Sequence, residues 1–347
     1  MKTSKIFVLL IMLALITIAF VACGQDQPPA QPGGEPAVQQ VTIRFANMNA
    51  EASWQGQAMN MFKNMVESRT DNVNIELFFA GVLGNEGELA ESISAGIVDM
   101  IAIGAGISVH IPNASIMEAP FVFHDFACAH RILHDPRFTT LHQRGAAEAN
   151  IVVLGYNPFG YRVVMGDRPV HSMADFHGYR LRIPNIPLWL HVWEALGANF
   201  VALPLSELIP ALEQGVIDGE DATVNNAITM GSYELSSYLI KTNHVKAFQM
   251  WMLNSNTYYS MTPEDRRIVR ESADAAIQWL WEIVEAGQYD DFAYLESVGY
   301  TIITPSPEFR AEMQQATIPV LEWFETVAPD GREILDVIEM IKREHGN

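Results

Sequence analysis

Gly178-Tyr-Arg-Leu-Arg-Ile-Pro-Asn185 is the segment around which the rest of the sequence can be interpreted. Within it, Arg182 stands between Leu181 and Ile183, an alternation typical of a strand that enters a core, and Pro184 ends the strand. A charge at the last position of a strand is stable when a carboxylate forms a two-pronged, charge-assisted hydrogen bond with the guanidinium. That carboxylate is either an Asp or Glu of this chain or part of a ligand, and the alternation alone leaves both readings open.

Strands and helices alternate on both sides of this segment. Before it, we expect strands over 41–46, 73–80 and 99–103, separated by helices over 58–66 and 86–97. After it, helices over 188–196 and 205–214 separate strands over 199–203 and 216–219. This order predicts right-handed βαβ units, and therefore an α/β fold of two lobes with mixed, mostly parallel sheets.

Separate strands are also expected over 151–155, 162–165 and 245–253, of which the second crosses between the lobes. Thr262-Pro-Glu-Asp265 combines a capping residue, a proline at the first helical position and acidic residues in the first turn. It predicts the start of a long helix that ends near Ser297. The tryptophans of the C-terminal part, Trp279, Trp281 and Trp323, are expected to pack in the core.

The N-terminus has the pattern of a lipoprotein signal peptide. Lys2 and Lys5 precede the apolar run Ile6–Phe20, which is too short for a spanning helix, and Ala22-Cys23 follows. We expect residues 1–22 to be a signal peptide, Cys23 to carry lipid, and residues 23–40, rich in Gln, Pro and Gly, to be a flexible tether. Ordinary cleavage, with release of the protein, is the alternative.

Charge and cysteine content restrict the partners of the mature chain. Removal of residues 1–22 leaves 19 basic and 41 acidic residues, a formal charge of −22, which argues against nucleic acid as a partner. The chain has two cysteines, so with Cys23 lipidated only Cys128 remains and no disulfide framework is expected.

Motifs that would identify an enzyme are missing from the sequence. There is no Gly-x-Ser-x-Gly, no phosphate loop, no His-Glu-x-x-His and no Cys-x-x-Cys. His130 and His134 have a spacing that can bind zinc, and Cys128 is nearby, but no third ligand has a suitable spacing. We therefore expect no enzyme, metal or cofactor, although 41 acidic residues leave a hydrolase with paired carboxylates as a rival.

A series of short pieces between Phe45 and Ile303 resembles, in its order and spacing, the solute-binding subunits of tripartite ATP-independent periplasmic (TRAP) transporters of the dicarboxylate and sialic-acid type. The pieces are Gly81-Val-Leu-Gly84, Gly96-Ile-Val-Asp99, Ala119-Pro-Phe-Val-Phe123, Gly160-Tyr-Arg162, Arg168-Pro-Val-His-Ser-Met-Ala-Asp175, Gly178-Tyr-Arg-Leu-Arg-Ile-Pro-Asn185, Leu196-Gly-Ala198, Leu205-Ser-Glu-Leu208, Ala211-Leu-Glu-Gln-Gly-Val-Ile-Asp-Gly219, Tyr233-Glu234 and Thr242-Asn-His244.

The resemblance implies two lobes joined by crossing strands and spanned by a long helix. We assign 41–160 and 245–275 to the first lobe, and 161–244 and 276–347 to the second. It also implies a role, which is to capture a small organic acid between the lobes and deliver it to the integral-membrane subunits of a transporter. A sensor that serves a signalling partner is the alternative among binding proteins, and the sequence does not name the acid.

The resemblance also implies the residues that hold the ligand. Arg182 matches the arginine that binds the ligand carboxylate, and Arg162 matches an assisting arginine. The remaining candidates that match ligand-contacting positions are Asn185, Asn49, Glu86, Gln249 and Trp251, and burial in the core is the alternative for Trp251. One position departs from the pattern, because Ala222 replaces an asparagine that contacts ligand in relatives, and Asn225 or Asn226 is the expected substitute.

Overall fold

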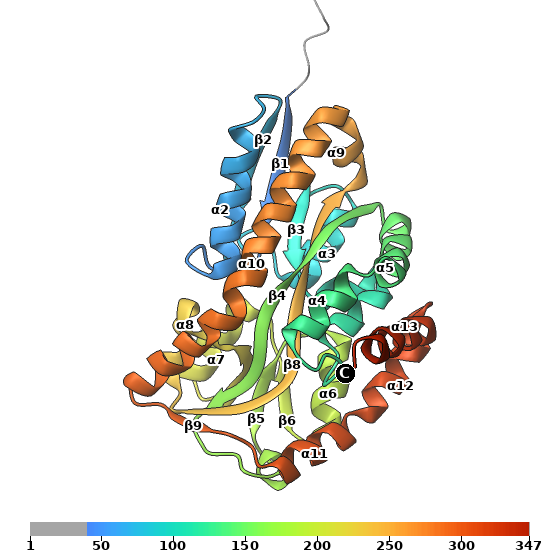
Figure 1. The fold of residues 1–347 in the computed structure, drawn as a ribbon. Coiled ribbons are helices and arrows are strands. Elements are labelled where there is room, and N and C mark those ends of the chain that lie inside the picture. Colours follow the sequence, from blue (N-terminus) through green and yellow to red (C-terminus); the bar gives the residue numbers. More distant parts are fainter. Residues whose placement is uncertain (1–39, 347) are drawn as a thin grey trace, which may run out of the picture. The chain divides into compact units, whose positions relative to one another are not determined.

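One mixed sheet organises the computed structural model, which describes residues 40–346 (Figure 1). Its strand order in the described part of the chain is β2-β1-β3-β8-β4-β7-β5-β6, and β9 pairs with β8. The strands are β1 (Val41–Ala46), β2 (Val73–Phe78), β3 (Met100–Ile103), β4 (Ile151–Gly166), β5 (Arg180–Ile183), β6 (Asn199–Ala202), β7 (Gly219–Thr223), β8 (Tyr238–Asn254) and β9 (Thr301–Ile303). The predicted α/β fold with two lobes is confirmed.

Each lobe is built on a parallel group of three strands. In the first lobe β1 pairs in parallel with β2 and β3, and the chain crosses between them through α2 (Trp54–Glu67) and α3 (Glu86–Ser94). In the second lobe β5 pairs in parallel with β6 and β7, with crossings through α6 (Pro187–Ala195) and α7 (Leu208–Glu213). The carboxyl ends of parallel strands are where α/β sheets place ligands, so these two groups position the site.

The long strands β4 and β8 join the two groups. They pair antiparallel from Ile151 opposite Asn254 to Gly166 opposite Tyr238, with register shifts at three points. We predicted separate strands over 151–155 and 162–165, and this was wrong because β4 is continuous. Pro158 and Gly160 do not break it, since β7 pairs only with Arg162–Gly166 and leaves the other edge of β4 free beside Pro158.

The strand predicted over 216–219 was also misplaced. β7 runs from Gly219 to Thr223, and its five residues are all buried although three of them are polar or charged. A sequence such as Gly-Glu-Asp-Ala-Thr has no apolar alternation, so its burial depends on partners that come from elsewhere in the fold. The residue boundaries that we assigned to the two lobes stay a prediction.

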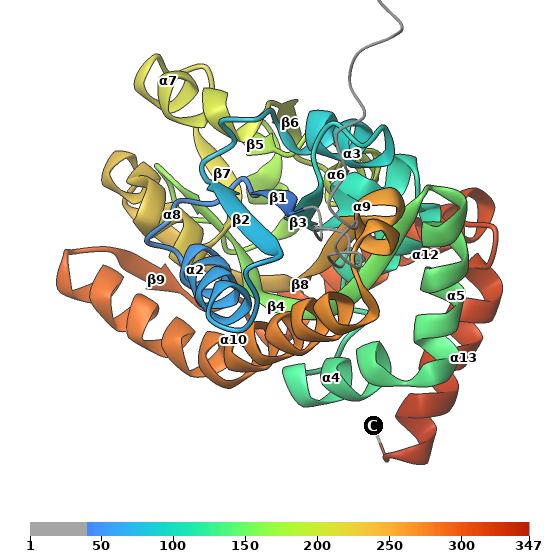
Figure 2. The same cartoon turned by 90° about the horizontal axis from the view of Figure 1, so that it is seen from above.

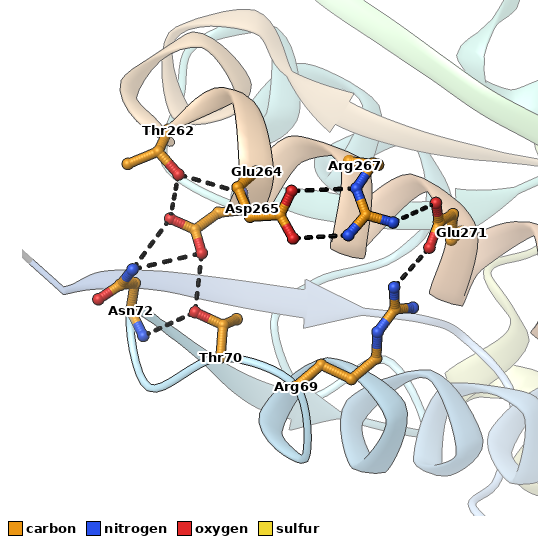
Figure 3. Close-up of polar contacts among 8 residues, drawn as sticks. All are labelled: Arg69, Thr70, Asn72, Thr262, Glu264, Asp265, Arg267 and Glu271. Atoms are coloured by element: carbon orange, nitrogen blue, oxygen red, sulfur yellow. Dashed lines mark hydrogen bonds and ion pairs between the residues drawn. The ribbon is translucent and has the colours of Figure 1, made fainter.

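The predicted long helix is α10 (Pro263–Ser297), which packs on α2 and β4 and runs along both lobes (Figures 1 and 2). Thr262 caps it by accepting a hydrogen bond from the Asp265 backbone N–H at 3.1 Å. The buried Asp265 carboxylate also accepts hydrogen bonds from Thr70 Oγ1 at 2.7 Å and Asn72 Nδ2 at 3.2 Å (Figure 3). These bonds fix the start of α10 to the segment that leads into β2.

An ion-pair network continues along the next turn of α10. Arg267 bonds Glu264 and, at 2.6 Å, Glu271, which in turn pairs with Arg69 (Figure 3). The four side chains are 32% to 64% exposed, and ion pairs this exposed contribute little to stability.

The other helices cover the sheet or complete the second lobe. They are α4 (Phe126–His134), α5 (Pro136–Glu148), α8 (Val224–Met230), α9 (Ser255–Ser260), α11 (Pro307–Ala316), α12 (Ile318–Val327) and α13 (Gly331–Glu344), with 3₁₀ turns η1 (Ala105–Val109), η2 (Pro112–Glu118), η3 (Met173–Phe176), η4 (Leu205–Glu207) and η5 (Ser232–Leu235). Trp279, Trp281 and Trp323 are partly buried against the apolar core, as predicted. Over 40–346, no helix combines the length and apolar character needed to cross a membrane.

Candidate functional site

A cavity of about 250 Å³ lies where the strand groups of the two lobes meet. It is lined from the first lobe by the loops after β1 and β3 and the start of α3, and from the second by β5, β7 and α8, with β4 and β8 between them. The lining includes Met48, Asn49, Glu86, Glu118, Phe159, Arg162, Arg182, Pro184, Asn185, Trp189, Glu220, Asp221, Ala222, Thr223, Asn226 and Gln249.

Arg182 lies in this cavity near the end of β5 and is only 5% exposed. Its Nε donates to the carbonyl of Leu203 at 3.0 Å, and none of the described carboxylates lies within ion-pair distance of its guanidinium. Burial lowers the pKa of Arg182 to about 10, and the charge interaction with Glu220 on the adjacent strand β7 opposes this shift. The two Nη groups are therefore available to an acceptor from outside the chain.

Arg162 is buried in the same cavity but already has a carboxylate partner. Its Nε donates to Asp221 Oδ1 and its Nη2 to the Asp221 backbone carbonyl, both at 2.9 Å, and the guanidinium lies 4.3 Å over the Trp189 ring. Asp221 is completely buried, and its other oxygen accepts from Trp193 Nε1 at 2.8 Å. Burial by itself raises the pKa of Asp221, but Arg162 and His244 outweigh burial and lower it to about 2.

Two glutamates line the cavity from the first lobe and bond the backbone that follows β3. Glu86 Oε1 accepts from the N–H groups of Gly104 and Gly106, both at 3.2 Å, and Glu118 Oε2 accepts from Ala105 at 3.0 Å. Burial raises the pKa of both carboxyls, that of Glu118 to about 7, although Arg162 opposes the rise at Glu118. These carboxyls can accept hydrogen bonds from a ligand and, when protonated, can also donate them.

The turn that holds these glutamates depends on glycine. A Cβ on Gly106 would lie 2.4 Å from Glu86 Cγ, and one on Gly104 would lie 2.6 Å from a Glu118 carboxylate oxygen. The close approach of both side chains to the backbone is possible only because no side chain stands at either position.

A chain of amide side chains links the lobes across the cavity. Asn49 Nδ2 donates to Asn226 Oδ1 at 3.0 Å, and Gln249 Nε2 donates to Asn49 Oδ1 at 3.3 Å. Gln249 Oε1 and Thr223 Oγ1 are buried and have no hydrogen-bond partner among the described residues. Buried polar atoms are normally satisfied, so these two atoms are candidates for contact with a bound molecule.

The structure brings together seven of the nine candidate ligand residues. Arg182, Arg162, Asn185, Asn49, Glu86, Asn226 and Gln249 line the cavity. Asn225 does not, although it precedes Asn226 on α8, so Asn226 is the one that stands near Ala222. Contact of any of these residues with a ligand stays a prediction.

Trp251 is the other candidate that lies outside the cavity. It is 1% exposed and packs edge-on against Phe45 and Phe62, with ring centroids 5.0 and 5.6 Å away. Trp251 follows Gln249 by two residues, but at that point α2 covers the strand, and the indole fills the core instead of the cavity.

Several lining residues were not among the candidates, and five of them have side chains that could serve a ligand. They are Glu118, Trp189, Glu220, Asp221 and Thr223. Glu118 directly precedes the Ala119-Pro-Phe piece, and Glu220 and Asp221 follow Asp218-Gly219, so their positions beside recurrent pieces were the available signal.

The two histidines that were considered as metal ligands stack on each other. His130 and His134 stack with ring centroids 4.0 Å apart beside Trp281, and Cys128 is buried. Between residues 40 and 346, no group of three or more His, Cys, Asp or Glu side chains is placed to hold a metal ion.

Comparisons with known proteins agree on one family. Residues 45–326 match the family described as bacterial extracellular solute-binding protein, family 7. The chain is similar to the 2,3-diketo-L-gulonate-binding periplasmic protein YiaO of Escherichia coli, with 25% identity over 87% of this chain and 92% of that protein. It is also 25% identical to the ectoine-binding periplasmic protein TeaA of Halomonas elongata, over 84% of this chain and 87% of that protein. A TRAP periplasmic solute binding protein from Haemophilus influenzae, solved with bound L-gulonate, superposes with a TM-score of 0.82 at 25% identity, covering 87% of this chain and 99% of that one.

Proposed function

The chain belongs to family 7 of the bacterial extracellular solute-binding proteins, and we propose that it captures a small organic acid between its lobes and delivers it to the membrane subunits of a TRAP transporter. The observation that supports this most directly is Arg182. It is a buried guanidinium that faces a cavity with two unused Nη groups and no carboxylate partner in the described chain.

A carboxylate of the ligand satisfies that guanidinium. The planar fork of arginine matches a carboxylate with two parallel hydrogen bonds, each of which contributes about 1.5–3 kcal/mol when one partner is charged. Arg162 contributes less charge to the ligand, because Asp221 neutralises it, and its main role is to extend the polar wall. The ligand therefore needs one carboxylate at the Arg182 end.

The glutamates of the cavity favour hydroxyl groups on the ligand. Glu86 and Glu118 present carboxyl oxygens to the cavity, and a hydroxyl can donate to them at either protonation state. We therefore propose a hydroxylated organic acid. Relatives named for 2,3-diketo-L-gulonate and crystallised with L-gulonate support this class, since both compounds combine one carboxylate with several oxygen functions.

Capture is coupled to closure of the lobes. Arg182 and Asn226 belong to the second lobe, whereas Glu86 and Asn49 belong to the first, so a ligand that contacts all four stabilises the closed arrangement relative to an open one. We propose that the membrane subunits recognise this closed form, and that the protein binds its ligand without converting it.

The experiment that tests this function is native mass spectrometry of the purified protein for co-purified ligand, followed by calorimetry with L-gulonate, 2,3-diketo-L-gulonate and ectoine. We expect one hydroxylated acid to bind at a ratio of one per chain and to be recovered unchanged. Chemical conversion of the bound acid, or binding of ectoine, which has a carboxylate but no hydroxyl group, in preference to both hydroxylated acids, would contradict the proposal.

We further propose that the mature protein is attached to the outer side of the cytoplasmic membrane by lipid on Cys23, which lies outside the described residues. The support is the sequence Ala22-Cys23 after an apolar signal, followed by a tether rich in Gln, Pro and Gly. Wild-type protein should partition into detergent and carry the mass of a diacylated cysteine, whereas Cys23→Ala should not. A wild-type protein released without lipid would show that the signal is cleaved in the ordinary way.

A further inference from the structure

A second cavity, of about 300 Å³, lies on the other side of the strands that join the lobes. We call it the basic pocket and define it by Tyr161 on β4, Lys241 and Lys246 on β8, Gln288 on α10 and Arg310 on α11. It shares no lining residue with the cavity around Arg182. Figure 1 shows α10 running alongside β4, and residues of α10 form part of the lining.

Lys246 is a buried cation without an acceptor. It is 7% exposed, and its Nζ forms neither a hydrogen bond nor an ion pair with any residue of the described chain. The nearest recorded interaction is with the face of the Tyr161 ring, whose centroid is 5.1 Å away. Burial, followed by the nearby Arg310, lowers the pKa of Lys246 to about 8. The ammonium therefore faces the pocket on a largely buried side chain, where an anion would compensate its charge.

Gln288 supplies a second donor without an acceptor. It is 3% exposed, and its Oε1 accepts from the Tyr161 backbone N–H at 2.9 Å. That bond fixes the orientation of the amide, because the backbone N–H can only donate. The Nε2 group is consequently a buried donor, and it has no partner within residues 40–346.

Two more cations complete the pocket. Lys241 lies 4.0 Å from the Phe292 ring centroid, and Arg310 donates to the Thr242 carbonyl at 3.2 Å while lying 5.4 Å from the Phe121 ring. Glu285 is the one acidic side chain of the lining, and no ion pair joins it to these cations in the described structure. Three unpaired cations thus gather in a chain with a formal charge of −20.

We propose that the basic pocket binds a small multivalent oxyanion, such as phosphate or a polycarboxylate. Oxyanion oxygens accept hydrogen bonds from ammonium, guanidinium and amide donors together, and these are the groups left free at Lys246, Arg310 and Gln288. The pocket is a separate site from the proposed organic-acid cavity, and the two can be tested independently. Since Tyr161 pairs with Lys246 across β4 and β8, the bound anion would contact the strands that join the lobes.

The test uses the mature protein with inorganic phosphate and, in a parallel arm, citrate. Phosphate could also enter the first cavity, so binding is measured by calorimetry and thermal shift in wild-type protein and in Arg182→Met, in which the first anchor is removed. We expect at least one of the two anions to bind to both proteins. Lys246→Met should weaken that binding at least about tenfold, because it removes one charge-assisted hydrogen bond, while leaving the affinity for the organic acid unchanged.

The same variants distinguish a binding role from a structural one. Without anion, Lys246→Met should melt no lower than wild type, because it removes an unpaired buried charge. Gln288→Glu keeps an acceptor for the Tyr161 N–H but places a negative charge in the pocket, so it should remain folded and lose anion binding. The proposal is overturned if neither anion binds to Arg182→Met, or if Lys246→Met and Gln288→Glu, each combined with Arg182→Met, both bind the anion as tightly as Arg182→Met alone does.

Discussion

Replacement of Arg182 by methionine tests the anchor of the proposed site most directly. Arg182 uses Nε for the Leu203 carbonyl, so the two Nη groups are what a ligand carboxylate can engage. Two charge-assisted hydrogen bonds of about 1.5–3 kcal/mol each amount to roughly 3–6 kcal/mol, or a loss of affinity of about 10²- to 10⁴-fold. Arg182→Lys keeps the charge but loses one of the two bonds, and we expect a loss of about 10- to 100-fold.

The assay is titration calorimetry with the acid that binds the wild-type protein, and the same strand supplies a matched control. Arg180 lies two residues before Arg182 on β5, but its side chain is 49% exposed and paired with Asp218 outside the cavity. Arg180→Met should therefore bind the acid normally. Thermal melts without ligand should show Arg182→Met to be at least as stable as wild type, because burial without a partner lowers the pKa of Arg182. An affinity of Arg182→Met within tenfold of wild type would refute Arg182 as the anchor.

Three further predictions concern residues around the anchor. Burial raises the pKa of Glu118 from 4.5 to about 7, so between these pH values the native state binds more protons than the unfolded state. Urea melts should therefore show that the free energy of unfolding falls as pH rises from about 4.5 to about 7, and Glu118→Gln should make this fall smaller. Equal slopes for the wild type and the variant would be inconsistent with titration of Glu118. Asn226→Ala should weaken binding of the acid about tenfold in calorimetry, whereas Asn225→Ala, outside the cavity, should not, and the reverse order would assign the contact to Asn225. Trp251→Ala should lower the free energy of unfolding by about 3–5 kcal/mol while the folded protein keeps its affinity, so a selective loss of affinity would return Trp251 to the site.

The sequence was sufficient where local signals and burial pointed the same way. Thr262-Pro-Glu-Asp265 marks a helix start by itself, and the long helix that follows begins and ends within a residue of the predicted positions. The strand at Arg180–Ile183 was likewise recognisable from Leu181 and Ile183, which are both fully buried. The candidate site could be located because its arginines lie beside recognisable pieces of the family.

Sequence patterns could not predict which polar side chains are buried. Glu220 and Asp221 are buried on a central strand with Ser232 bonded to the first and Arg162 to the second, and these partners are 12 and 59 residues away in sequence. Their burial is a property of the assembled lobes. Trp251 could not be assigned for the converse reason, since an aromatic residue near a site has the same local signature whether it faces the cavity or fills the core.

The different environments of the two arginines argue for selectivity within the organic acids. Asp221 pairs with Arg162, so Arg182 supplies the one positive charge without an ion-pair partner among the described lining residues. A second ligand carboxylate would find no other arginine or lysine without an ion-pair partner in the described lining, and it would add negative charge to a cavity in which burial already raises the pKa of Glu86 and Glu118. Hydroxyl groups meet no such opposition, because they donate to those same oxygens. A hydroxylated monocarboxylate should therefore bind more tightly than a dicarboxylate of similar length, and the difference should become smaller in Glu118→Gln.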